Sequence, residues 1–152
     1  MHSDYHNKEI RMAAEENRAL IRRFLEELFN QHDVAAIDRY IAADYVDHVV
    51  PPGVPPTREG FTQFIRSFLE ALPDFHYTIE DMIVDGDRVA VRLTADGTQQ
   101  GAFNGIPPTG KHATWSEMHI GRIKDGAIVE HWGEIDNMGM LQQLGVIPAP
   151  QA

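Results

Sequence analysis

The sequence predicts a single α+β domain in which helices come first and an antiparallel sheet follows. Two features of its pattern support this class. Apolar residues recur at helical spacing as far as Leu72, and the spacing then changes to every second residue. The length of 152 residues adds a third observation, because it falls within the usual size of one domain. We therefore expect one domain over 1–152, with flexible tails at 1–9 and 148–152.

Two helices are predicted in the first part of the chain. The first starts near Ile10 and carries one apolar stripe until Asn30 breaks the pattern. Asp33 is placed to cap a short second helix that extends to Ile41. Irregular structure is expected to follow at 43–44.

A proline-rich loop separates these helices from a third. Its four prolines exclude an ordered helix over 50–56, and Thr57 is well placed to cap the helix that comes next. Apolar residues then repeat at helical spacing from Phe61 to Leu72, where Pro73 ends the pattern. The third helix should therefore be strongly amphipathic.

Four strands are predicted after Pro73, arranged as two hairpins. The turns are Asp85-Gly86-Asp87 and Asp125-Gly126, which suit tight connections. The strands are expected at 77–83, 88–95, 114–124 and 127–134, and a short helix at 136–144 follows them. Tyr77, Ile79, Asp81 and Ile83 are expected on one face of the first strand. Three helices followed by four strands suggest that the helices lie on one face of an antiparallel sheet. If the sheet is curved, a pocket opens between the layers, and this pocket is the expected binding site.

Composition and charge exclude several functions. The net charge of −10 would repel nucleic acid phosphates, and the 13 Lys and Arg residues form no basic stripe. There is no cysteine, and therefore no disulfide or thiol chemistry. No apolar run is long enough to span a bilayer or to form a signal-peptide core, so a cytoplasmic protein without membrane contact is expected.

Several separated blocks of the sequence occur in a recognisable order. They are Asp44-Tyr45-Val46-Asp47-His48, Pro51-Pro52-Gly53, Arg58-Glu59-Gly60, Gly105-Ile106-Pro107-Pro108-Thr109-Gly110-Lys111, Asp125-Gly126-Ala127-Ile128-Val129-Glu130-His131-Trp132, and Asp136 with Leu141-Gln142-Gln143-Leu144-Gly145. Together they resemble the SnoaL-like polyketide cyclases, or ester cyclases, of the NTF2-like superfamily. The resemblance covers roughly 14–147 and is specific because the blocks agree in order.

The resemblance implies a fold, a reaction and a partner. The fold would be an NTF2-like cone of curved antiparallel sheet with three N-terminal helices, commonly a homodimer or higher homo-oligomer packed through the outer sheet face. The reaction would be a cofactor-free, metal-free intramolecular aldol ring closure on a small hydrophobic polyketide methyl ester, with Asp136 as the acid/base residue. One departure is Gln99, where relatives often carry a histidine, so a titratable group is lost.

Asp136 has a second interpretation from the residues alone. It stands directly before a short apolar helix, where aspartate is a favoured cap. For proton transfer its pKa would have to be raised by an apolar pocket, which nearby Trp132, Ile135 and Met138 could supply. Replacement by asparagine should then abolish turnover and leave the fold intact.

Further candidates lie on the predicted strands. Trp115, Glu117 and His119 alternate on one face of the third strand, where Glu117 can fix the tautomer of His119 and make it a second proton carrier. This face lines either the cavity or an exposed polar row. Arg92 is either pocket-lining or paired with an acidic residue outside.

Two more residues, His48 and Trp132, are candidates for substrate binding. His48 either polarises a substrate carbonyl or ties down the proline loop. Trp132 belongs to the core or to a cavity wall. His131 is interpreted as structural. The eight histidines show no His-x-x-x-His or His-Glu-x-x-His spacing on a helix, so no metal is expected.

Two other functions stay open from the sequence alone. The same pocket and base would serve an isomerase or hydratase of a hydrophobic carbonyl compound, so the enzyme class is lyase or isomerase. A non-catalytic small-molecule binding module is the third possibility, since one fold hosts many functions.

Overall fold

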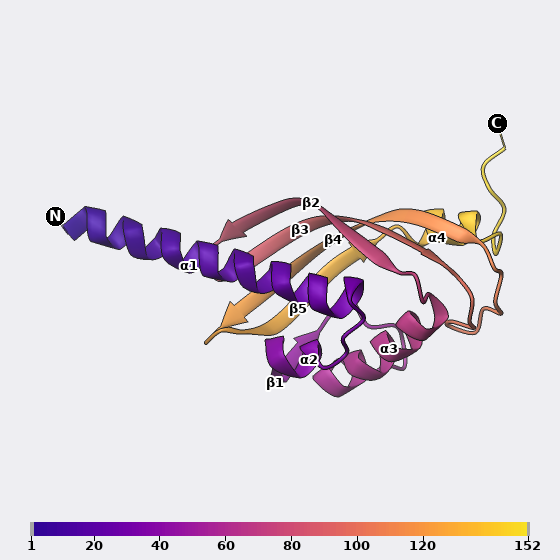
Figure 1. Ribbon diagram of the computed structural model, residues 1–152, viewed down its shortest axis with the longest axis horizontal. Helices are drawn as coiled ribbons and strands as arrows, with labels where there is room; N and C mark the ends of the chain where they lie inside the picture. Colours follow the sequence, from indigo (N-terminus) through magenta and orange to yellow (C-terminus); the bar gives the residue numbers. More distant parts are fainter. Residues whose placement is uncertain (1, 152) are drawn as a thin grey trace.

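The computed structural model describes residues 2–151 and shows helices against one face of a five-stranded sheet (Figure 1). The helical elements are α1 His2–Leu25, the π-helical turn η1 Glu26–Asn30, α2 Ala36–Tyr40, α3 Arg58–Ala71 and α4 Asn137–Gln143. The strands are β1 Ile41–Asp47, β2 His76–Asp85, β3 Arg88–Thr98, β4 His112–Lys124 and β5 Ala127–Ile135. The predicted α+β class, with helices on one side of a curved sheet, is confirmed.

The sheet has the strand order β1-β5-β4-β3-β2. Both predicted hairpins are present, because β2 pairs with β3 and β4 with β5 in antiparallel register. The prediction of helix to Ile41 and irregular structure at 43–44 is wrong, since these residues form β1, which pairs with β5 in parallel. β1 pairs with a strand far along the chain, and local spacing cannot reveal such a partner.

A bulge in β2 changes which side chains face the core. The register against β3 shifts between Ile79 and Asp81, so the alternation reverses at that point. Met82 is then half-buried, whereas Ile83 is 67% exposed. The prediction that Ile83 shares a face with Tyr77 is therefore wrong, because an inserted residue moves every later side chain to the opposite face.

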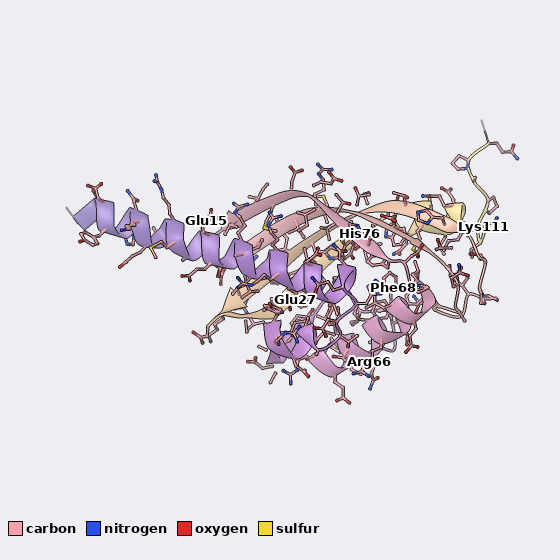
Figure 2. All side chains as sticks on the ribbon, viewed as in Figure 1. Glu15, Glu27, Arg66, Phe68, His76 and Lys111 are labelled. Carbon is pink, nitrogen blue, oxygen red and sulfur yellow. The ribbon has the colours of Figure 1, made fainter. Side chains whose placement is uncertain are left out.

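Helix α1 begins at His2 rather than near Ile10. Its first half extends beyond the sheet, and all residues from 3 to 13 are exposed (Figures 1 and 2). Residues 1 and 152 lie outside the described part of the chain, and flexibility of the two tails stays a prediction. Within residues 2–151, no helix is both long and apolar enough to cross a bilayer.

The helices are fixed to the sheet by one hydrophobic cluster. Leu28, Ile37 and Leu93 are at most 1% exposed, and each such burial stabilises the fold by about 1.5–3 kcal/mol. Phe68 of α3 lies between its helix and the sheet, with its ring centroid 4.8 Å from that of Phe75 (Figure 2). The predicted cap of α3 is confirmed, because the Thr57 hydroxyl accepts a hydrogen bond from the Gly60 amide.

Candidate active site

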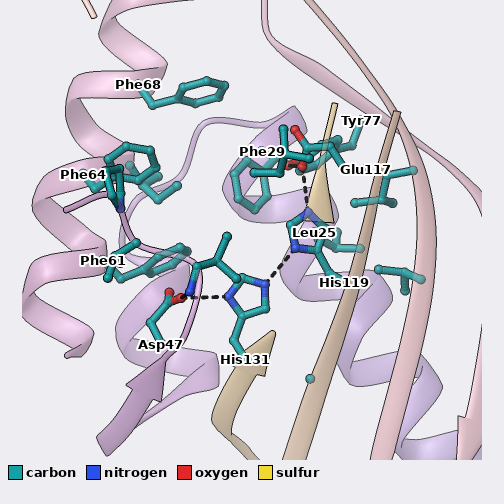
Figure 3. A pocket seen from close by; sticks show the side chains of 18 of the residues that line it. Leu25, Phe29, Asp47, Phe61, Phe64, Phe68, Tyr77, Glu117, His119 and His131 are labelled. Atoms are coloured by element: carbon teal, nitrogen blue, oxygen red, sulfur yellow. Dashed lines mark hydrogen bonds and ion pairs between the residues drawn. The ribbon is translucent and has the colours of Figure 1, made fainter. Parts of the chain in front are cut away.

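A cavity of about 590 Å³ lies between the helices and the inner face of the sheet. Its walls are largely apolar and aromatic (Figure 3). Phe29 contributes from η1, Phe61, Phe64 and Phe68 from α3, and Trp115 from β4. A concave apolar site of this volume is typical of proteins that bind small molecules.

Four polar side chains form a hydrogen-bonded row on the sheet side of this cavity (Figure 3). Oε2 of Glu117 lies 2.7 Å from Nε2 of His119, whose Nδ1 lies 2.8 Å from Nε2 of His131. Nδ1 of His131 lies 3.3 Å from Oδ1 of Asp47. We call these four residues the carboxylate–imidazole chain. It contains every aspartate, glutamate and histidine that lines the cavity within the described residues.

Strand alternation brings the four residues together. Glu117 and His119 lie two residues apart on the inward face of β4. His131 lies inward on β5, and Asp47 is its register partner on parallel β1. Gly133 lies opposite His119, and a Cβ at that position would be only 2.2 Å from Nδ1 of His119. The imidazole of His119 therefore occupies space that only glycine leaves open.

Glu117 is held as a buried carboxylate. It is 4% exposed and accepts hydrogen bonds from the Tyr77 hydroxyl at 2.5 Å and the Trp115 indole at 2.7 Å. Burial raises its pKa, but the hydrogen bonds from His119, Tyr77 and Trp115 outweigh that effect and leave the pKa below its ordinary value. Burial and the adjacent carboxylate raise the pKa of Tyr77, which stays a protonated donor.

Asp47 ends the chain in a similar environment. Its carboxylate accepts hydrogen bonds from the Tyr45 hydroxyl and the Val49 amide, both at 2.7 Å. Burial raises its pKa, and hydrogen bonds from His131, Tyr45 and Val49 lower it further than burial raises it. Burial also lowers the pKa of His131, more than the neighbouring Asp47 carboxylate raises it. The two carboxylates are thus ionised near neutral pH, and a cation on His131 is disfavoured.

The row is linear and does not converge on a central point. Glu117 contacts His119, His119 contacts His131, and His131 contacts Asp47. Among residues 2–151, no group of three or more histidine, aspartate or glutamate side chains is arranged to hold a metal ion. The arrangement is suited to passing protons between imidazoles, because each ring nitrogen has a partner.

Three of the candidate residues from the sequence lie on the cavity wall. Trp115, Glu117 and His119 all face inward, so the structure resolves which face of this strand lines the cavity. Thr114, Ser116 and Met118 face the opposite side and are exposed. The functional roles given to the three inward residues stay predictions.

Asp136 lies outside the cavity wall and is exposed. Its Oδ1 accepts a hydrogen bond from the Gly139 amide at 2.9 Å, which caps α4. The prediction of an apolar pocket around this carboxylate is wrong, because the side chain of the preceding Ile135 faces the cavity and Met138 is 66% exposed. This geometry favours the helix-capping interpretation.

His48, Arg92 and Trp132 lie on the outer face of the sheet, so their placement in a substrate pocket is wrong. Successive side chains along a strand point to opposite faces, and each of these residues follows one that faces the cavity: Asp47, Val91 or His131. The His48 ring stacks on Trp132 with centroids 5.2 Å apart. Arg92 takes the alternative of an acidic partner, with Nε 2.6 Å from Oδ2 of Asp81.

Sequence reasoning missed Asp47 and His131. No strand is predicted around Asp47 from the sequence, although Tyr45 and Asp47 alternate inward as in a strand. His131 is interpreted as structural because it alternates with Trp132, the residue taken for the core or the cavity wall. A register shift between β4 and β5 precedes His131, and this makes parity along β5 hard to infer.

Gln99 has a structural role at the rim of the cavity. It is 1% exposed, and its Nε2 donates to the carbonyl oxygen of Pro107 at 3.2 Å. The Thr109 hydroxyl donates to its Oε1 at 2.8 Å. Gln99 therefore holds the rim loop at 103–110, and it is not among the residues that line the cavity.

This fold and site define a class of protein. An α+β fold with an apolar cavity can enclose a small hydrophobic molecule, and the titratable side chains on the cavity wall lie where they would contact it. The model of the SnoaL-like polyketide cyclase family matches residues 19–144, and the chain belongs to this family.

Individual relatives agree with this assignment. Nogalonic acid methyl ester cyclase of Streptomyces nogalater is 28% identical over 120 residues, which cover 77% of this chain and 89% of the relative. The structure of IdmH from Streptomyces antibioticus, assigned as a polyketide cyclase, has a TM-score of 0.72 and 37% identity, and the match covers 85% of this chain and 98% of IdmH. AclR of Streptomyces galilaeus, a proposed hydroxylase, has a TM-score of 0.78 and 29% identity, covering 89% and 99% of the two chains.

Proposed function

We propose that this protein is a cofactor-free polyketide cyclase. It closes a ring in a small hydrophobic polyketide ester by an intramolecular aldol reaction. The observation that carries the proposal is the carboxylate–imidazole chain on the wall of an apolar cavity of about 590 Å³. Membership of the SnoaL-like family and similarity to an ester cyclase support the reaction class.

The reaction needs a base and then an acid. The base removes a proton from a carbon flanked by carbonyls, and the resulting enolate carbon attacks a second carbonyl. One C–H bond breaks, one C–C bond forms, and the abstracted proton returns to the new alkoxide. The product is an isomer of the substrate, so no other reactant is consumed.

The histidine pair suits both proton steps better than the carboxylates do. Hydrogen bonds hold the pKa values of Glu117 and Asp47 below their ordinary range, which makes both groups weak bases. An imidazole has the ordinary side-chain pKa nearest neutrality. The side chains of His119 and His131 are 14% and 18% exposed, and both line the cavity. We therefore assign the acid–base role to this pair, with Glu117 stabilising the imidazolium.

The apolar walls assist the chemistry in two ways. Phe61, Phe64 and Trp115 bury the hydrophobic parts of the substrate and exclude water from the enolate. The low local dielectric strengthens the interaction between an imidazolium and its carboxylate neighbour. No lysine or arginine is found among the lining residues of the described chain, so an uncharged ester suits this cavity better than a free carboxylate.

Nogalonic acid methyl ester, the compound in the relative's name, is the first substrate to test. Purified protein treated with a chelator is expected to convert it to an isomer of equal mass, detected by liquid chromatography and mass spectrometry. His119→Gln should reduce the rate by roughly 10²–10⁴-fold, the usual contribution of an acid–base group. Asp136→Asn should keep most of the activity, because asparagine also caps helices.

Other outcomes of the same assay would reassign the protein. Binding of the ester without turnover would support a non-catalytic binding module. A product heavier by one water would support a hydratase, and loss of activity in Asp136→Asn with retention in His119→Gln would return the acid–base role to Asp136.

A further inference from the structure

The carboxylate–imidazole chain has three internal contacts, and each needs one proton to be a hydrogen bond. The contacts are Glu117 to His119 at 2.7 Å, His119 to His131 at 2.8 Å, and His131 to Asp47 at 3.3 Å. Two ionised carboxylates contribute no proton, and two neutral imidazoles contribute one each. When both imidazoles are neutral, the chain therefore has one proton fewer than its three hydrogen bonds require.

Counting protons distinguishes the possible states. With four protons, both imidazoles are cations and two N–H groups face each other across the 2.8 Å contact between His119 and His131. With two protons, at least one contact lacks a proton: either a nitrogen lone pair lies against a carboxylate oxygen at one end, or two lone pairs face each other across the 2.8 Å contact between the rings. Only three protons satisfy all three contacts.

In the two-proton state, the contact that lacks a proton should be the one between His131 and Asp47. That contact, at 3.3 Å, is the longest of the three, whereas the Glu117 end is closed at 2.7 Å. His119 then donates from Nε2 to Glu117 and accepts at Nδ1 from Nε2–H of His131. This leaves Nδ1 of His131, a residue that lines the cavity, without a proton.

We infer that Nδ1 of His131 is the atom that takes the substrate proton, and that the chain relays the resulting positive charge to His119. As the proton arrives at Nδ1 of His131, the proton on its Nε2 moves to Nδ1 of His119. The cation then lies against Glu117, and all three contacts are satisfied. Asp47 is a positioning residue that holds the His131 ring. The catalytic part of this inference rests on the proposed function.

The electrostatic surroundings agree with this direction of transfer. Burial lowers the pKa of His131, so a positive charge that stays on this ring is disfavoured. The other titratable groups that face the histidine pair are Tyr77 from β2, Glu117 from β4, and Tyr45 and Asp47 from β1. The side chains that α1 and α3 present to the cavity are apolar.

The relay also matches a general requirement of catalysis. Interactions that are complete only after proton transfer favour the transition state over the ground state. The chain has this property because the substrate proton supplies the missing hydrogen bond. The same proton is available for return to the alkoxide.

Nuclear magnetic resonance of ¹⁵N-histidine-labelled full-length protein tests the relay without any substrate. Above the pH at which the pair gains its proton, both histidines are expected as Nε2–H tautomers. On acidification the pair should gain one proton, not two, while the protein stays folded. A His131 in the Nδ1–H tautomer, or two cationic histidines in the folded protein, would overturn the inference.

A pH–rate profile tests the positioning role of Asp47. Asp47→Asn keeps the shape of the side chain but removes the charge that favours protonation of the pair. Its acidic limb should therefore move to lower pH, and its maximal rate should fall at least tenfold. Asp81→Asn removes one charge from the outer face and should leave the profile unchanged.

A rate loss in Asp47→Asn with an unmoved acidic limb would show a merely structural role and contradict the assignment. The tautomer result is independent of turnover. Failure of the cyclase assay with the expected tautomers would overturn the proposed function alone, and the opposite tautomers with full turnover would overturn the relay alone.

Discussion

The two faces of the sheet carry similar residues in different environments. On the inner face, Glu117 and His119 lie 2.7 Å apart and are 4% and 14% exposed. On the outer face, Glu130 and His48 lie 3.3 Å apart and are 22% and 44% exposed. Residue type alone therefore does not define the site. Burial, the further donors around Glu117 and the adjoining cavity distinguish the inner pair from an ordinary surface ion pair.

The largest difference between the faces should appear in catalysis. His119→Gln is expected to reduce kcat by roughly 10²–10⁴-fold, because the histidine pair then lacks the imidazole that holds the positive charge beside Glu117. His48→Gln, the matched change on the outer face, should leave kcat within about twofold, since surface substitutions away from a site have small effects. Steady-state kinetics with the ester substrate provides the measurement. Equal losses of kcat in both variants would show that the inner and outer histidines do not differ in their effect on catalysis.

Gly133→Ala should damage the inner face without removing any polar group. The new Cβ would lie 2.2 Å from Nδ1 of His119, so the imidazole must move away from His131. We expect a loss of activity of at least about tenfold, because small misplacements of catalytic groups are costly. Glu134→Ala, the next residue on the outer face, is the control. An active Gly133→Ala variant with an unchanged thermal midpoint would show that the contact between the histidines is dispensable.

The inner face should also control stability in acid. The pKa values of Glu117 and Asp47 lie below the ordinary values of 4.5 and 3.8, and that of His131 lies below 6.5. In each case the unfolded chain binds more protons than the folded protein as the pH falls. The stabilisation is therefore complete at pH values above the pKa of each group in the unfolded chain. It is lost as the pH falls through the lower pKa of the same group in the folded protein.

Urea unfolding at a series of pH values between 7.5 and 3 tests this effect. The free energy of unfolding should fall by about 1 kcal/mol or more, since each unit of pKa shift corresponds to about 1.36 kcal/mol. Asp81→Asn should follow the wild-type curve, and Glu117→Gln should flatten it. A wild-type curve that is flat over this range would contradict the assigned pKa directions.

Asp136→Ala is expected to act on stability and to leave activity nearly intact. Loss of the hydrogen bond to the Gly139 amide should cost about 1 kcal/mol, which is typical of a helix N-cap. Asp136→Asn should be nearly neutral, because asparagine provides an equivalent oxygen. Thermal unfolding and the ester assay on the two variants distinguish a cap from a catalytic acid, which would lose turnover in both.

The smallest effect is expected for Arg92→Ala on the outer face. Its pair with Asp81 has side chains 50% and 58% exposed, so water and salt screen the attraction. The free energy of unfolding should change by less than about 0.5 kcal/mol. A change in KM for the ester would instead indicate that this arginine contacts the substrate.

The helices and both hairpins could be predicted because their signals are local. Apolar spacing placed α3, and the Asp-Gly turns placed the hairpins β2–β3 and β4–β5. The β1 strand could not be predicted, because it pairs with β5, far along the sequence. Asp47 of the carboxylate–imidazole chain was missed for the same reason, since it lies on that strand.

Parity explains the remaining errors in the candidate site. The alternation of Trp115, Glu117 and His119 was evident, but nothing local indicated which face is inward. His48, Arg92 and Trp132 face outward because the residue before each of them faces the cavity. Tertiary packing decides which residues face the cavity, and the local sequence does not show it. The position of Asp136 alone indicates a helix cap, whereas the resemblance to a family favours the role of acid/base residue.

The parallel edge strand β1 has a consequence for how the site forms. The contact between Asp47 and His131 joins residues 84 positions apart, so it closes one of the longer loops in the fold. β1 also has a neighbour on one side only, and edge elements with few contacts open more readily than central ones. Assembly of the site should therefore be a late folding event, and fraying of this edge should be the first way in which a weakened variant loses it.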